Sequence, residues 1–293
     1  MTPNSTRGFT LLEMSIVLTI IGFIVGGILV GRNLITASEI SATITQVEKF
    51  KSATAAFQEK YGALPGDLPK SVATSFGFTA RGTSAGEGDG NNLIEGITGS
   101  GNNGRAQGGG ETSMFWVDLT TANGHNLNLI PGSFYTATPT SLLTSAIQGT
   151  AFGSYFPEAK LGKGNYFFVY SYNGVNYIGL SSLTNVSAGN VMYSITSITV
   201  LQAYGIDKKI DDGYPQLGVV LANYVDGNVV FGAAGSEMIS GSTPAAGGIG
   251  TAATKGTAYT CYDNGNIANT NQTYSLEING GNGPNCALSF VLQ

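Results

Sequence analysis

Apolar positions divide the first sixty residues of the chain into two helical segments. Residues 9–31 form an apolar run in which Glu13 is the only charged side chain. Residues 32–60 contain neither proline nor glycine, and large apolar side chains recur there every three to four positions, which is helical spacing. The pattern predicts one continuous helix over residues 9–60, roughly 78 Å long, that ends before Gly62.

The apolar part of this helix is long enough to cross a membrane, since a hydrocarbon core of about 30 Å needs about 20 apolar residues. A cleaved secretory signal peptide is the alternative. It would need a basic start, a shorter apolar stretch and a small-residue cleavage site. Arg7 is the only basic residue before the run, and no such cleavage site follows at Arg32. We therefore expect a retained membrane span.

Glu13 stands out because a carboxylate inside an apolar helix costs several kcal/mol unless it finds a partner or stays hydrated near the membrane surface. The sequence around it, Arg-Gly-Phe-Thr-Leu-Leu-Glu at residues 7–13, resembles the processing site of type IV pilins and type II secretion pseudopilins. Three other strings, at residues 63–67, 88–91 and 206–213, are similar to segments of pilin-like proteins of comparable length.

The resemblance implies a processed N-terminus. In this family a membrane peptidase cuts after the glycine and methylates the amine of the new first residue. Carried over, residues 1–8 are a leader that is removed after Gly8, Phe9 carries the methylated amine, and Glu13 is retained. In a filament, the Glu13 carboxylate of one subunit is then expected to pair with the Phe9 amine of another and to set the register of assembly.

The resemblance also implies a division of the chain into membrane and head segments. Residues 9–31 are the transmembrane and assembly half of the helix, residues 32–60 its amphipathic half, and residues 61–293 a globular head. The precursor is expected in the bacterial inner membrane with its head in the periplasm. The assembled subunit is expected in a periplasmic or extracellular filament.

Beyond residue 60, short runs of aromatic and β-branched residues predict strands. They occupy residues 166–171, 175–180, 217–225, 228–231, 273–278 and 286–292. Asn-Gly at 173–174 and Asp-Gly at 226–227 are two-residue hairpin turns, so the strands that they join are antiparallel. Residues 77–110 are rich in glycine and asparagine and predict long loops.

Two short helices accompany these strands. One is predicted over residues 111–122, and the other follows Thr199, whose capping box is completed by Gln202. We expect the antiparallel sheet of the head to pack on the amphipathic half of the long helix. This arrangement makes the fold class α+β and the architecture pilin-like, with long loops in the head.

Composition and charge exclude several functions. Charged residues make up 11% of the 293 positions and the net charge is −5, so the chain lacks the basic character of a nucleic-acid-binding protein. The single histidine, His125, excludes a two-histidine metal site within one chain. The glycine pattern at residues 99–104 follows no predicted strand and is rejected as a nucleotide site. We assign no catalytic residue and do not expect an enzyme.

Acidic residues in the head predict one cation site. Glu87, Asp89 and Asn91 place oxygen ligands at alternate positions, Glu95 follows, and the glycines between them permit a tight turn. EF-hand spacing is absent, but the resemblance raises the expectation because some pseudopilins bind calcium in a head loop. Calcium is therefore the one candidate cofactor, and a solvated acidic loop is the alternative.

A second acidic group, formed by Asp207, Asp211 and Asp212, lies near the predicted C-terminus of the second short helix. Negative charge is unfavourable there because of the helix dipole. We expect the neighbouring Lys208 and Lys209 to compensate it, and a bound cation is the alternative.

Cys261 and Cys286 are the only cysteines of the chain. A disulfide between them would close a loop of about 26 residues and stabilise the fold by roughly 3 kcal/mol. The resemblance places the head in an oxidising compartment, where such a bridge persists. Two free thiols are the alternative.

The sequence favours a structural subunit of a type IV pilus or a type II secretion pseudopilus. Its expected partners are a prepilin peptidase and methylase, further copies or other pilin-like subunits, and an inner-membrane assembly platform with its ATPase. One alternative is a minor pilin at a filament tip whose loops bind a surface or glycan as an adhesin. The other is a membrane-anchored periplasmic enzyme, which would keep residues 1–8.

Overall fold

The computed structural model describes most of the chain. The described residues are 10–97, 106–120, 129–134, 138–141, 143–187, 192–226, 229–231, 258, 260–263 and 272–293. The predicted processing residues Gly8 and Phe9, and His125, lie outside them.

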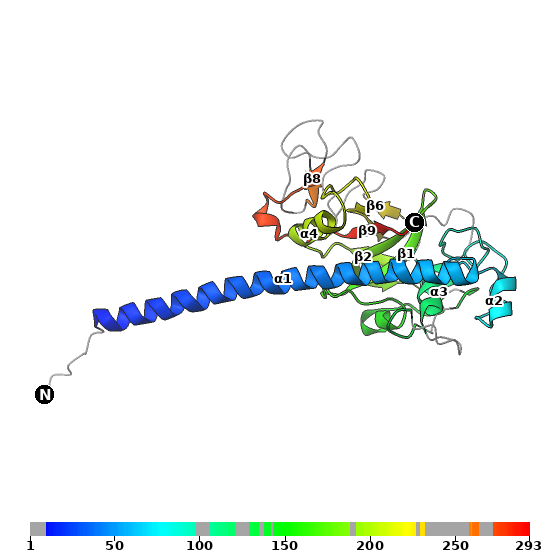
Figure 1. Cartoon of the computed structure of the whole chain (residues 1–293), viewed down its shortest axis with the longest axis horizontal. Helices are drawn as coiled ribbons and strands as arrows, with labels where there is room; N and C mark the ends of the chain where they lie inside the picture. The colour runs from blue at the N-terminus through cyan, green and yellow to red at the C-terminus, as the bar shows by residue number, and fades with distance from the viewer. Residues whose placement is uncertain are drawn as a thin grey trace.

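Helix α1 runs unbroken from Leu11 to Tyr61, a length of roughly 77 Å. It begins with a capping box in which the Thr10 side chain accepts the backbone N–H of Glu13, while the Glu13 carboxylate accepts the backbone N–H of Thr10 at 2.7 Å. It ends at Gly62, whose φ of 76° suits a residue without a side chain. The predicted long helix is therefore confirmed over its described residues, and its first part extends away from the head (Figure 1).

The second part of α1 belongs to the core of the head. Its buried residues recur every three or four positions and are Ile40, Thr43, Val47, Phe50, Ala53, Thr54, Phe57 and Tyr61. The ring of Phe50 lies 5.1 Å from the rings of both Trp116 and Phe167, measured between centroids. These aromatic contacts join α1 to the neighbouring helix and to the sheet, and they explain why this half of α1 lies on the head.

The main sheet is antiparallel and has five strands. They are β1 (Asn165–Tyr172), β2 (Val175–Val186), β3 (Met192–Ile195), β4 (Val220–Leu221) and β9 (Leu288–Val291). The order is β1-β2-β9-β4, and β3 pairs with the second half of β2. The predicted Asn-Gly hairpin is present, with positive φ at Asn173 and Gly174. The α+β, pilin-like architecture is thus confirmed.

Smaller elements surround this sheet. The helices are α2 (Lys70–Phe76), α3 (Gly110–Leu119) and α4 (Val200–Ile210), with short 3₁₀ segments η2 (Gly149–Ser154) and η3 (Asn279–Gly281). The remaining strands form two hairpins, β5 (Tyr224–Asp226) with β6 (Val229–Phe231) and β7 (Tyr262–Asp263) with β8 (Thr273–Tyr274). The capping box predicted at Thr199 and Gln202 is confirmed at the start of α4.

Two predicted strands are shorter than expected. The prediction over residues 217–225 is wrong for residues 217–219, which form a loop. The Asp211 carboxylate accepts the backbone N–H of Val219 in this loop and that of Val220 where β4 begins. The strand predicted over residues 273–278 ends at Tyr274, because Ile278 donates its backbone N–H to the Ser275 carbonyl and the chain turns.

The predicted disulfide between Cys261 and Cys286 is present, and both cysteines are fully buried. The backbone N–H groups of Ser197 and Ile198 both donate to the Cys286 carbonyl. The bridge therefore links the β7–β8 hairpin to the segment between β3 and α4 and to the strand β9 that follows Cys286.

Candidate functional site

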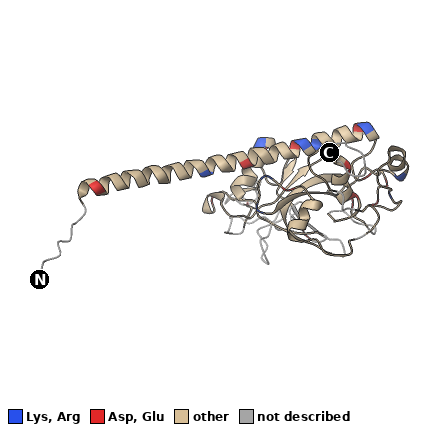
Figure 2. Ribbon diagram, turned by 90° about the horizontal axis from the view of Figure 1, so that it is seen from below, with Lys and Arg blue, Asp and Glu red and all other residues tan. Residues whose placement is uncertain are grey.

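The free part of α1 carries almost no charge. Glu13 and Arg32 lie 19 positions apart, and the residues between them, 14–31, are about 27 Å of helix without a charged side chain. Figure 2 shows this stretch in tan between the first red segment of α1 and the first blue one. Its large apolar side chains are exposed, with Phe23 at 78%. Within the described residues, α1 is the single helix long and apolar enough to cross a membrane.

An exposed apolar surface of this length is unstable in water and needs lipid or another protein to cover it. Four glycines lie on it, at positions 22, 26, 27 and 31, and a Cβ atom added to any of them would meet nothing within 4 Å. A glycine inside a helix costs about 1 kcal/mol relative to alanine. These glycines pack against nothing in the described part of the chain, and small residues of this kind allow a second helix to approach closely.

Glu13 lies at the start of this apolar surface. One of its carboxylate oxygens, Oε2, accepts the backbone N–H of Thr10 at 2.7 Å and the hydroxyl of Thr10 at 2.8 Å. Among the residues that the structure describes, the ion pair that forms is Arg81 with Asp118 in the head, so Glu13 has no cationic partner there.

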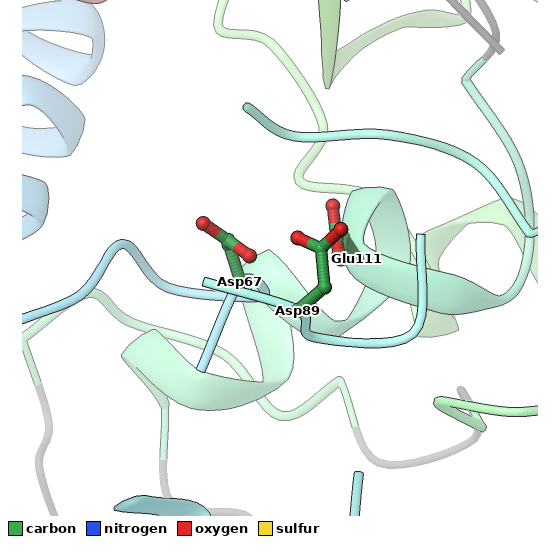
Figure 3. Close-up of side chains that lie close together, drawn as sticks. All are labelled: Asp67, Asp89 and Glu111. Carbon is green, nitrogen blue, oxygen red and sulfur yellow. The ribbon is translucent and has the colours of Figure 1, made fainter. Parts of the chain in front are cut away.

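A second cluster of interest lies in the head, where the carboxylates of Asp67, Asp89 and Glu111 point toward one another (Figure 3). Their oxygens lie within 4.8 Å of one another, and we call these three residues the carboxylate cluster. Asp67 follows α1, Glu111 lies in the first turn of α3, and Asp89 lies in the loop between α2 and α3. Asp67 and Glu111 are fully buried, whereas Asp89 is exposed.

The two buried carboxylates organise the loop that carries Asp89. Asp67 accepts the backbone N–H groups of Gly90 at 2.6 Å and Asn92 at 2.7 Å. Glu111 accepts those of Gly88 at 2.9 Å and Glu95 at 2.8 Å. Four amides that would otherwise lack partners are thus satisfied by two side chains, so the loop depends on the cluster for its shape.

Burial makes these carboxylates difficult to ionise. It raises the pKa of Asp67 to about 7, against a smaller opposing effect of the Gly90 and Asn92 amides. Burial, followed by the nearby charge of Asp67, raises the pKa of Glu111 to about 9. In the described part of the chain no lysine or arginine pairs with either group. Three carboxylates at this spacing are chemically suited to an oxygen-preferring cation such as calcium.

The structure rearranges the calcium ligands predicted from residues 87–95. Of the predicted carboxylates, only Asp89 lies in the cluster. Glu87 turns back and accepts the backbone N–H groups of residues 83 and 84, both at 3.2 Å. Asn91 donates its side-chain amide to Asp89 at 3.2 Å and to Glu95 at 3.0 Å. Asn91 and Glu95 therefore lie beside the cluster and not in it.

The sequence reasoning missed Asp67 and Glu111. A signal for Asp67 existed, because it ends the string at residues 63–67 that resembles other pilin-like proteins. For Glu111 the only signal was its place at the start of a predicted helix. Acidic residues are common there because they interact favourably with the helix dipole, so this position did not indicate a cation site.

The residues of the second acidic group accept hydrogen bonds that stabilise the neighbouring loops. Asp207 accepts the Tyr274 hydroxyl at 2.8 Å, Asp211 accepts the two amides described above, and Asp212 accepts the N–H of residue 214 at 2.8 Å. Burial raises the pKa of Asp207 to about 7. Lys208 and Lys209 lie in the last turn of α4, where Lys208 donates to the Tyr204 hydroxyl and Lys209 to the Ser41 hydroxyl, so their compensation of the acidic group stays a prediction.

Comparison with known families gives a match at the N-terminus. Residues 3–29 match the prokaryotic N-terminal methylation motif, which includes Gly8, Phe9 and Glu13. No curated protein and no solved structure matches the chain. Together with the long apolar helix and the antiparallel sheet, the motif supports a prepilin of the type IV pilin or pseudopilin kind, processed by a prepilin peptidase.

Proposed function

We propose that the chain is a structural subunit of a type IV pilus or a type II secretion pseudopilus and polymerises through the free part of α1. The observation that carries this proposal is a charge-free, exposed helical surface over residues 14–31, most of which lies within the matched methylation motif. The surface can be covered by lipid before assembly and by the equivalent helices of other subunits afterwards. A head-to-tail contact of this kind repeats and generates a helical filament.

In this proposal, the chain is cut after Gly8 and Phe9 becomes a methylated, cationic N-terminus. Glu13 of one subunit pairs with the Phe9 amine of a neighbour. Each charge alone is costly in an apolar bundle, so the pair favours one register over others.

The remaining partners follow from the same proposal. A prepilin peptidase processes the precursor, and an inner-membrane platform with its ATPase drives assembly. The head lies in the periplasm, where the disulfide between Cys261 and Cys286 is chemically stable. The role is structural, and the chain catalyses no reaction of its own.

The test is the mass and N-terminal sequence of the full chain produced together with a prepilin peptidase. We expect a chain that begins at N-methylated Phe9. The matched control is Gly8→Val, which leaves the apolar helix intact but removes the small residue at the cut, and is expected to keep residues 1–8. Retention of residues 1–8 by the unaltered chain, when it is produced together with an active peptidase, would contradict the proposal.

A further inference from the structure

A groove of about 1030 Å³ opens where α1 leaves the head. One wall is α1 over residues 29–40, and the other is formed by the start of α4 with the loops that carry Lys163 and Asn282. In Figure 1, α4 and the red segment beside it lie at the end of the head from which the free part of α1 extends. We call this feature the junction groove.

The junction groove lies at the expected level of the membrane surface. Residues 14–31 carry no charge and rise by about 27 Å, close to the hydrocarbon thickness of about 30 Å. If these residues span the bilayer, Leu29 lies at the edge of the hydrocarbon and Arg32 at the level of the lipid headgroups. Because both residues line the groove, that end of it then lies at the membrane surface.

The lining of the groove combines exposed apolar side chains with two cations. Leu29 and Ile35 of α1 are 58% and 61% exposed, and Leu201 at the start of α4 is 43% exposed. The cations are Arg32 and Lys163, and both are exposed. A groove that combines apolar walls with cations is complementary to a lipid with a negatively charged headgroup.

One acidic residue, Glu39, also lines the groove. Its carboxylate accepts the side-chain amide of Gln202 at 3.4 Å, which ties it to α4. The charged groups that line the groove are thus Arg32, Lys163 and Glu39, with a net charge of +1. The balance therefore favours an anionic occupant.

We propose that the junction groove binds an anionic phospholipid of the membrane that α1 spans, with the phosphate between Arg32 and Lys163 and an acyl chain along Leu29. The inference rests on membrane insertion, as in the proposed function, and goes beyond it by assigning a lipid site to the head. A second copy of α1 is the other candidate occupant. It is less suited, because its apolar part offers the two cations one carboxylate at most.

The experiment uses the full chain in vesicles of phosphatidylcholine, with or without about a third of phosphatidylglycerol. A phosphatidylglycerol with a photoreactive group near its headgroup reports the groove, and a phosphatidylcholine with such a group at the acyl terminus reports insertion. Labelled peptides are identified by mass spectrometry. We expect headgroup labelling of residues 199–205, and an excess of unlabelled phosphatidylglycerol should compete it away while phosphatidylcholine does not.

The variant Arg32→Gln with Lys163→Gln should lower headgroup labelling of residues 199–205 about tenfold, since each cation near a charged membrane contributes to binding. The matched control, Lys60→Gln with Lys70→Gln, removes the same charge from the last turn of α1 and the start of α2, and should leave labelling unchanged. Both cations of the test variant are exposed, so the fold should be unaffected, which an unchanged melting temperature would verify.

The outcomes separate this inference from the proposed function. Acyl-chain labelling over residues 14–31 in every vesicle shows that the chain is inserted. If residues 199–205 are then labelled equally in the unaltered chain and in the Arg32→Gln, Lys163→Gln variant, or if phosphatidylcholine competes with the probe, lipid binding in the junction groove alone is overturned. Cross-links between residues 199–205 and a second copy in place of lipid adducts would also overturn it. Loss of labelling over residues 14–31 would overturn insertion and the groove together.

Discussion

The carboxylate cluster predicts an unusual dependence of stability on pH. Asp67 has a pKa of about 7 in the folded head, against an ordinary value of 3.8. A carboxyl whose pKa is raised by folding binds a proton more tightly in the folded state, so its protonated form favours folding. This contribution is fully present below about pH 4 and is lost as the pH rises through 7.

The magnitude follows from the size of the shift. Three units at about 1.4 kcal/mol each correspond to a loss on the order of 4 kcal/mol for Asp67 between pH 4 and pH 8. Glu111, with a pKa raised to about 9, acts in the same direction, but the two groups interact and their effects do not add. For a head of this size, 4 kcal/mol corresponds to a fall in melting temperature on the order of 10 °C.

The assay is thermal unfolding of the full chain in detergent from pH 5 to pH 8, with a chelator present. We expect the melting temperature to fall steadily over this range. Asp67→Asn removes one titrating group and should flatten the slope, whereas Glu59→Gln, at an exposed position on α1, should leave it unchanged. A melting temperature that rises or stays constant from pH 5 to pH 8 in the unaltered chain would refute the reasoning.

Four further predictions concern assembly and the head. The Glu13→Ala chain should still be inserted and cut, but the yield of sheared filaments should fall at least about tenfold. The reason is that the Phe9 amine of a neighbour would be buried without a partner, and an unpaired buried charge costs about 3–5 kcal/mol. Wild-type filament yields on an immunoblot would count against the pairing. Gly26→Leu should reduce filaments without changing the melting temperature, since its Cβ meets nothing within 4 Å. By contrast, Gly66→Ala should unfold the head, because its Cβ would lie 2.3 Å from the Glu111 carbonyl oxygen. Calcium binding at the carboxylate cluster stays a prediction. Millimolar calcium should raise the melting temperature at pH 8 and not at pH 4. An equal rise at both pH values would argue against binding at this cluster.

Local signals were sufficient to predict most elements of the fold. The apolar run and the three-to-four spacing predict α1, the Asn-Gly pair at 173–174 predicts the first hairpin, and Thr199 with Gln202 predicts the start of α4. Each of these signals depends on neighbours in the sequence. Strand β3 was missed because its place in the sheet depends on pairing with the second half of β2.

The carboxylate cluster lay beyond sequence reasoning for a physical reason. Asp67, Asp89 and Glu111 are each 22 residues apart, and they meet only because α3 packs its first turn beneath the loop that carries Asp89. The alternation at residues 87–95 correctly drew attention to the loop. It could not indicate that the Glu87 carboxylate would accept backbone N–H groups of its own loop. Nor could it indicate that buried carboxylates from outside residues 87–95 would complete the cluster.

The position of α1 in assembled material tests the structural role most directly. The measurement is electron cryo-microscopy of sheared filaments from cells that produce the full chain together with a prepilin peptidase. We predict that residues 11–35 of α1 form the filament centre, in contact through Gly22 and Gly26, with Glu13 beside the Phe9 amine of a neighbour. Filaments that lack the chain, or that expose this part of α1 on their surface, would contradict the proposed subunit role.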